Sequence, residues 1–208
     1  SKVRFLDKNE ELRLREALRA RDAKIKEQRL SANKFRHDRD YDLLPDLSSQ
    51  SFADYLEPIV LLGLNTGMRR GEILTLEWQN VDLRNKNLTV ISENAKSGKT
   101  RHIPLNNEAF DALKRWKLDS GSSGGVFKGQ DGKPLLEIRK SWATVLDMAK
   151  IENCRFHDLR HHFASRLVMA SVDLNTVREL LGHSDLTMTL RYAHLAPEHK
   201  AAAVNLIG

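Results

Sequence analysis

Strand-forming residues are concentrated in one short stretch of this chain, and helical patterns lie on both sides of it. Residues 87–92 contain the run Leu-Thr-Val-Ile, and residues 101–105 form a second candidate strand after a turn at residues 95–98. A short piece at residues 81–83 could add a third strand, while Pro104 indicates a strand end or a sheet edge. The pattern therefore predicts an α+β fold, mostly helical, with one small antiparallel three-stranded sheet.

Apolar residues at helical spacing cover most of the remaining chain. We expect helices at residues 8–29, 52–65, 69–78, 107–118, 138–150, 157–170, 173–182, 185–194 and 197–206. Ser51 is a candidate N-cap for the second of these helices, in which residues 59–62 are apolar and predict burial. Residues 31–50 are polar and contain Pro45, which predicts a loop.

The charge balance restricts the class of partner. Among 208 residues, 34 are Lys or Arg and 28 are Asp or Glu, which gives a formal net charge of +6. A basic chain can bind a polyanion such as nucleic acid, although many basic proteins bind none. Cys154 is the only cysteine, which excludes an internal disulfide and indicates a reducing compartment. No apolar run approaches the roughly 18 residues of a membrane-spanning helix.

Residues 66–72 have the composition of an anion clamp. Gly67 allows a sharp turn between two helices, and Arg69 then lies near the start of the second helix, where backbone N–H groups are free. A guanidinium beside such donors can bind an anion in bidentate geometry. Glu72 can pair with Arg69 or Arg70 from one helical turn away. The alternative is an ordinary helix start with solvated arginines.

Two further segments carry groups that can move protons. Lys96 lies in the predicted hairpin turn, where it could donate a proton to a substrate or simply form a solvated turn. His157 and Arg160 share a helix face and combine a titratable imidazole with a permanent cation. His157 and His161 also have the spacing of a helical zinc site, but Asp158 occupies the position where zinc proteases have glutamate.

A fourth segment contains His183 and, later in the chain, Tyr192. A tyrosine on a late helix is usually a packing residue, but a tyrosine near arginines and histidines can be a nucleophile. Together the four segments supply what phosphodiester transesterification without a metal requires. Arginines and a histidine would neutralise the pentacoordinate transition state, a phenol would attack phosphorus, and a lysine would protonate the leaving oxygen.

This ordered set of arginine, lysine, His-x-x-Arg, histidine and tyrosine resembles the tyrosine recombinases of the phage integrase family. The resemblance extends from about Leu6 to Ile207 and is densest at residues 66–81, 95–105 and 156–194. It implies the fold of a tyrosine-recombinase catalytic domain. Ser171 is a departure, because the resemblance leads us to expect glycine in that turn between helices, where another residue adds mild strain.

The resemblance implies a role for each candidate residue. Arg69 and Arg160 would bind the non-bridging oxygens of the scissile phosphate, His183 would hydrogen-bond that phosphate, and Glu72 would support the first arginine. Tyr192 would form a 3′-phosphotyrosyl link. The remaining roles are that Lys96 protonates the 5′-hydroxyl leaving group and that His157 acts as acid or base toward the tyrosine. Neither a cofactor nor a metal is implied, because the protein–DNA bond conserves the energy of the phosphodiester.

The implied activity is site-specific cleavage and rejoining of DNA, which integrates or excises a mobile element. Residues 1–208 would be the catalytic domain of a longer integrase whose N-terminal core-binding domain is absent from this sequence. The expected partner is double-stranded DNA at attachment or core sites, bound by a homotetramer that is weakly associated or monomeric without DNA. The tail from Pro197 would pack on its own core or exchange between protomers. We expect a cytoplasmic, nucleoid-associated protein of a bacterial or phage-infected cell, with no membrane contact.

Three other functions remain open from the residues alone. A type IB topoisomerase-like enzyme would use the same groups but rejoin the original strand. A DNA-binding regulator could keep the fold without catalysis. A metal hydrolase would use His157, His161 and His162 as ligands.

Overall fold

The computed structural model describes residues 3–91, 98–129, 132–197 and 204–205. The α-helices in this part of the chain are α1 (Lys8–His37), α2 (Leu56–Thr66), α3 (Arg70–Leu74), α4 (Asn107–Ser120), α5 (Arg139–Ala149), α6 (Asp158–Met169), α7 (Leu174–Leu181) and α8 (Thr187–Leu190). The strands are β1 (Val81–Asp82), β2 (Asn87–Val90) and β3 (Arg101–Pro104). Short 3₁₀ turns occupy Trp78–Asn80 and Ala193–Leu195. The predicted α+β class is confirmed.

The sheet is antiparallel in the order β1-β2-β3, and β2 pairs with β3 in the register Val90 to Arg101. Leu88, Val90 and Ile103 are buried, because alternate residues of a strand face the same side. The predicted three strands and the strand end at Pro104 are therefore confirmed. The tip of the hairpin, residues 92–97, lies outside the described residues.

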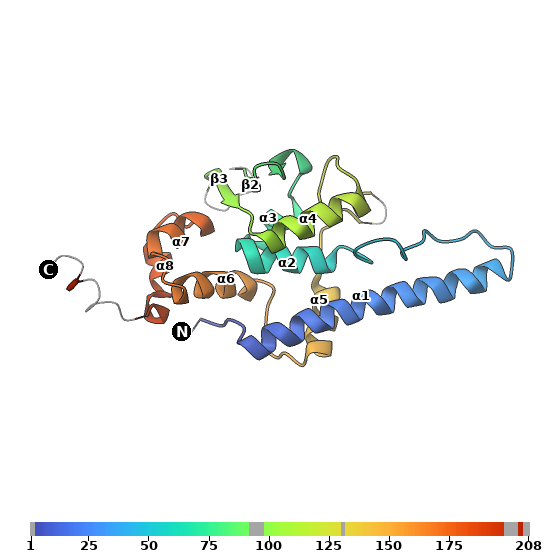
Figure 1. The fold of residues 1–208 in the computed structure, drawn as a ribbon, viewed down its shortest axis with the longest axis horizontal. Helices are drawn as coiled ribbons and strands as arrows, with labels where there is room; N and C mark the ends of the chain where they lie inside the picture. The colour runs from blue at the N-terminus through green and yellow to red at the C-terminus, as the bar shows by residue number, and fades with distance from the viewer. Residues whose placement is uncertain (1–2, 92–97, 130–131, 198–203, 206–208) are drawn as a thin grey trace.

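The core forms around α2, which is buried along nearly its whole length, as its apolar sequence predicts. Figure 1 shows α2 and α4 in the middle of the molecule, with α6 continuing toward the end that carries α7 and α8. Gly63 permits the close approach of α2 to α6, since a Cβ there would lie 3.1 Å from Cδ1 of Leu159. This packing fixes α6, the helix that carries His157, Arg160 and His161 at its start.

The first helix is longer than the sequence predicts. It begins with a capping box in which Asp7 and Glu10 satisfy each other's backbone N–H groups, and it continues to His37. The loop expected at residues 31–50 is therefore wrong over residues 31–37. Asn33 explains the extension, because its side chain exchanges two hydrogen bonds with the backbone of Leu44 and so fastens the returning chain to the helix. Figure 1 shows this part of α1 extending to the right, beyond the other helices.

Other predicted helix boundaries also differ from those in the structure. Ser51 does not cap α2, which begins at Leu56; the backbone N–H groups of Ser51 and Phe52 donate to Asp119 instead. The third helix ends at Leu74, and the helix expected at residues 197–206 lies largely outside the described residues. Ser171 has a φ of 67°, in the left-handed region where we expected strain. None of the helices in the described ranges is long and apolar enough to cross a membrane.

Candidate active site

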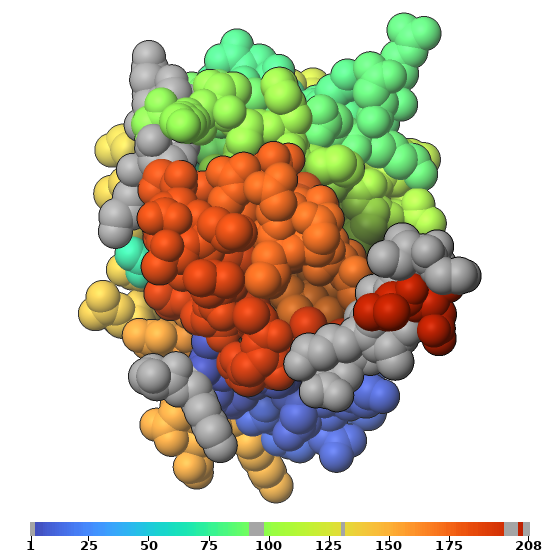
Figure 2. Space-filling model, turned by 90° about the vertical axis from the view of Figure 1, so that its left-hand side faces the viewer, coloured from blue at the N-terminus to red at the C-terminus, as the bar shows by residue number. Residues whose placement is uncertain are grey.

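A pocket of about 320 Å³ opens between the start of α3, the start of α6 and the segment from the end of α7 to Tyr192. Its lining residues are Arg69, His157, Arg160, His161, Gly182, His183, Ser184, Met188, Arg191 and Tyr192. Figure 2 shows this end of the molecule: orange and red residues of α6 to α8 fill the middle, with green residues above and blue N-terminal residues below. Five of the six predicted catalytic residues thus meet in one pocket. The sixth, Lys96, lies outside the described residues.

Arg160 is held by the ends of two helices. Its Nη1 donates to the carbonyl oxygen of Gly67 at 2.8 Å and its Nη2 to that of Leu181 at 2.6 Å. Gly67 and Gly182 end α2 and α7 in the left-handed conformation, so each helix ends in a turn at this side chain. Burial, together with the charge of Arg69, lowers the pKa of Arg160 to about 9, which leaves it protonated at neutral pH.

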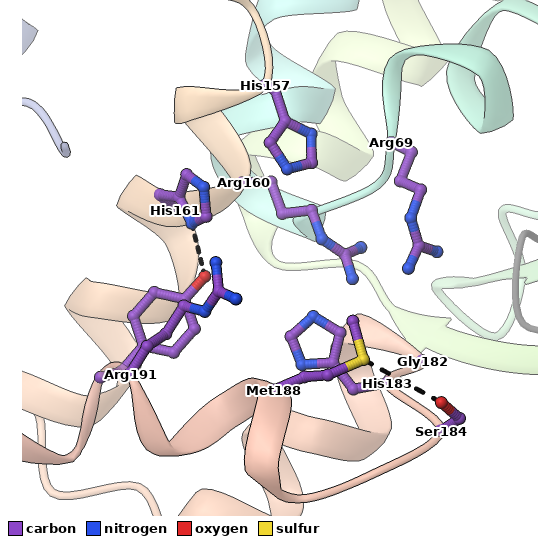
Figure 3. Close-up of a pocket in the computed structure, with 10 residues that line it drawn as sticks. Arg69, His157, Arg160, His161, Gly182, His183, Ser184, Met188 and Arg191 are labelled. Atoms are coloured by element: carbon purple, nitrogen blue, oxygen red, sulfur yellow. Dashed lines mark hydrogen bonds between the residues drawn. The ribbon is translucent and has the colours of Figure 1, made fainter. Parts of the chain in front are cut away.

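Arg69 is fixed by Glu72, as the sequence predicted. One Glu72 oxygen accepts the backbone N–H of Arg69 at 2.8 Å, and the other accepts its Nη1 at 2.9 Å. Arg101 binds the same carboxylate through two hydrogen bonds, at 3.0 and 2.7 Å. Burial raises the pKa of Glu72, but the hydrogen bonds and charge of Arg101 outweigh it and hold that pKa below its ordinary value. Figure 3 shows the guanidinium groups of Arg69 and Arg160 facing the same space.

The phenol of Tyr192 lies inside the pocket, with 1% of the residue exposed. Its oxygen lies 2.6 Å from Nδ1 of His161. Burial raises the pKa of Tyr192, while burial and the neighbouring His157 lower the pKa of His161 to about 4. At neutral pH both groups are therefore uncharged, and one proton lies in the hydrogen bond between them.

The other two histidines line the pocket from opposite sides, as Figure 3 shows. Nδ1 of His183 lies 2.9 Å from the hydroxyl oxygen of Thr189, so Nε2 is the nitrogen that can form a hydrogen bond with a ligand. Burial, with Arg160 nearby, lowers its pKa to about 3. His157 packs edge-on against His161 with ring centroids 5.0 Å apart, and burial lowers its pKa as well.

The three-histidine metal site considered from the sequence is not formed. His162 faces α1, where its Nε2 lies 3.1 Å from a carboxylate oxygen of Glu11, and it is absent from the pocket. Within the described ranges, no three His, Cys, Asp or Glu side chains come together as metal ligands. His162 therefore belongs to the packing of α6 on α1.

The sequence did not single out three residues that the structure brings to the site: His161 as the partner of Tyr192, Arg101 and Arg191. The sequence could have indicated the burial of Arg101, because it lies two residues before the inward-facing Ile103 in a predicted strand and therefore faces the same side. A buried arginine requires acceptors for its N–H groups, and a carboxylate such as Glu72 can supply two of them. His161 had no comparable signal, since Tyr192 follows it only much later in the chain.

The chain is similar in sequence to integrases and tyrosine recombinases. The integrase of Salmonella phage P22 is 36% identical over 155 residues, which cover 69% of this chain and 40% of that protein. Tyrosine recombinase XerC of Xanthomonas campestris pv. campestris strain B100 is 39% identical over 144 residues, covering 66% of this chain and 43% of XerC. The chain thus spans less than half the length of these relatives.

A solved structure matches almost the whole chain. The catalytic domain of bacteriophage HP1 integrase superposes with a TM-score of 0.67 at 26% identity, covering 98% of this chain and 95% of that domain. The sequence model of the phage integrase family matches residues 5–199. The extent of this match, over a fold and a pocket that carry the expected residues, shows that the chain belongs to the phage integrase family.

Proposed function

We propose that this protein cuts and rejoins DNA at specific sites through a 3′-phosphotyrosyl intermediate, and so integrates or excises a mobile element. The observation that carries the proposal is the Tyr192 phenol, buried in the pocket that Arg69 and Arg160 line and hydrogen-bonded to His161. A tyrosine that served only packing would not require three arginines and three histidines around it. The family's catalytic domains have the same overall fold.

In this proposal the scissile phosphate enters the pocket against Arg69, Arg160 and His183. The two guanidiniums bind its non-bridging oxygens, and Nε2 of His183 donates a hydrogen bond. Because the arginines are already fixed by Glu72 and by helix-end carbonyls, they need no rearrangement as negative charge grows on phosphorus. We therefore propose that catalysis is independent of metal ions and cofactors.

The phenol oxygen of Tyr192 then forms a bond to phosphorus while the bond from phosphorus to the 5′ oxygen breaks. We propose that the phenol proton passes to His161, which lies 2.6 Å away, and that His157 beside it serves as the second acid or base. Lys96 protonates the 5′ oxygen. In the rejoining step the 5′-hydroxyl of another strand attacks phosphorus and gives its proton to Lys96. The bond from phosphorus to the Tyr192 oxygen breaks, and that oxygen takes its proton back from His161.

We further propose that residues 1–208 are the catalytic domain of a recombinase with a separate core-binding domain. The match to 95% of the HP1 catalytic domain supports this. The proposed partner is double-stranded DNA, which the net charge of +6 favours. Recombination between two duplexes needs four cleavages, so we propose a homotetramer on DNA, with the tail after Pro197 exchanged between protomers. The protein would act in the cytoplasm, where that DNA lies.

Covalent trapping on a nicked suicide substrate tests the proposal. The substrate carries the attachment site of the element that encodes the protein, and a nick releases the short 5′-hydroxyl strand so that resealing cannot occur. We expect a protein–DNA adduct on a denaturing gel, with or without EDTA, and none with Tyr192→Phe. No adduct from the full-length protein would refute the proposal and favour a silent DNA-binding regulator. Adducts without strand exchange between two labelled duplexes would favour topoisomerase-like relaxation.

A further inference from the structure

Arg101, the first residue of β3, bonds to two other elements that border the pocket. Its two terminal nitrogens donate to Glu72 on α3, and its Nε donates to the carbonyl oxygen of Leu180 on α7 at 3.1 Å. Only 8% of the residue is exposed. One guanidinium therefore joins the hairpin, the start of α3 and the end of α7.

The bond to Glu72 affects the charge that Arg69 presents to a ligand. The Glu72 carboxylate is shared between Arg69 and Arg101, and both ion pairs are at most 2.9 Å long. If Arg101 were absent, Arg69 would remain as the cation paired with this buried carboxylate. Its positive charge would then be drawn toward Glu72 and away from the pocket.

The bond to Leu180 affects the opposite wall of the pocket. Leu181, the next residue, supplies a carbonyl oxygen to Arg160, and His183 follows two positions later. Gly182 fits tightly against Arg101, because a Cβ on Gly182 would lie 2.8 Å from Cδ of the arginine. The position of Arg101 thus fixes the turn that carries these phosphate-binding groups.

We propose that Arg101 is a positioning residue, which couples β3 to the start of α3 and the end of α7 and so holds in place the arginines and the histidine that bind the scissile phosphate. The inference rests on the proposed function and adds to it a residue that touches neither substrate nor nucleophile. Its loss displaces several catalytic groups together, and a displacement of about 1 Å can cost roughly 10²-fold in rate.

Single-turnover formation of the covalent adduct tests this role, measured against DNA concentration in Arg101→Met, Arg101→Lys and a matched control. Arg21→Met is that control, because Arg21 binds Asp54 through two hydrogen bonds at 2.9 and 2.6 Å, is nearly as buried, and lies outside the pocket. Urea unfolding measures the stability lost in each variant.

We expect Arg101→Met to lower the rate at saturating DNA about 10²-fold while the half-saturating concentration changes little. Arg21→Met should lose stability but keep the wild-type rate, and Arg101→Lys should recover part of the rate. Equal rates in Arg101→Met and Arg21→Met, or a defect seen only in the half-saturating concentration, would overturn the inference. If Arg101→Met does not fold, Arg101→Lys decides: an intermediate rate supports the inference and a wild-type rate overturns it. An unreactive wild type would instead refute the proposed function.

Discussion

Replacing His161 with glutamine tests which side chain accepts the proton of the nucleophile. Glutamine keeps an acceptor oxygen near the phenol of Tyr192 but cannot take up a proton. The pKa of His161 is about 4, and that of Tyr192 lies above its ordinary 10. Both shifts disfavour transfer in the resting pocket, because the imidazole is a weak base there and the phenol a weak acid. The proton therefore moves only as the bond to phosphorus forms, which is the step that general-base catalysis accelerates.

We expect His161→Gln to form the covalent adduct about 10²–10⁴-fold more slowly at saturating DNA. Its free energy of unfolding should fall by no more than about 1.5 kcal/mol, because one hydrogen bond is weakened and not left without an acceptor. The assay is single-turnover trapping on the suicide substrate. A second substrate carries sulfur in place of the bridging 5′ oxygen, and its leaving group needs no protonation. On this substrate Lys96→Met should form the adduct at close to the wild-type rate, whereas His161→Gln should still form it slowly.

His157→Gln is the matched comparison, because both histidines lie at the start of the same helix and line the same pocket. If His161 is the group that accepts the phenol proton, His161→Gln should slow adduct formation on the sulfur substrate more than His157→Gln does. A wild-type rate for His161→Gln together with a slow His157→Gln would refute the reasoning and return the role to His157.

Three other predictions concern stability. Gly67→Ala should destabilise by about 1–3 kcal/mol in urea unfolding, because the new Cβ would lie 2.4 Å from the Phe163 ring at a φ of +63°, whereas Gly71→Ala, with nothing within 4 Å, should not destabilise. Glu72→Gln should cost about 3–5 kcal/mol, since it leaves the buried Arg101 and the half-buried Arg69 without their carboxylate; a loss under 1 kcal/mol would contradict this. The pKa of His183 is about 3 when folded and about 6.5 when unfolded, so the unfolded chain binds the proton first and thermal stability should fall as pH drops from 6.5 toward 4. His183→Gln should reduce that dependence, and an unchanged slope would contradict it.

The groups that the sequence identifies correctly are those set by local rules. The hairpin followed from β-branched residues on either side of a turn. Helical spacing allowed Glu72 to pair with Arg69 or Arg70, and the structure pairs it with Arg69. Left-handed Gly67 between α2 and α3 followed from the need for a sharp turn.

The groups that it misses depend on contacts between distant segments. Tyr192 and His161 meet because α6 and the turn after α8 pack together, and no pattern in either segment specifies the other. The extra turns of α1 depend on Asn33 binding the backbone of Leu44, which is again a contact outside the helix. Secondary-structure preferences therefore predicted most of the helices and strands that carry the pocket residues, and tertiary packing decided which histidine bonds to Tyr192.

In the proposed mechanism, the electrostatics of the pocket link phosphate binding to the activation of Tyr192. Burial and neighbouring positive charges lower the pKa values of Arg160, His161 and His183 together, so the pocket disfavours positive charge. A phosphodiester supplies a negative charge close to all three and opposes that effect. Each unit by which the pKa of His161 returns toward 6.5 lowers the cost of accepting the phenol proton by about 1.4 kcal/mol. Under the proposed function, His161 would be a weak base without DNA and a stronger base with a phosphodiester in the pocket, which would restrict the reactivity of Tyr192 to the complex with DNA.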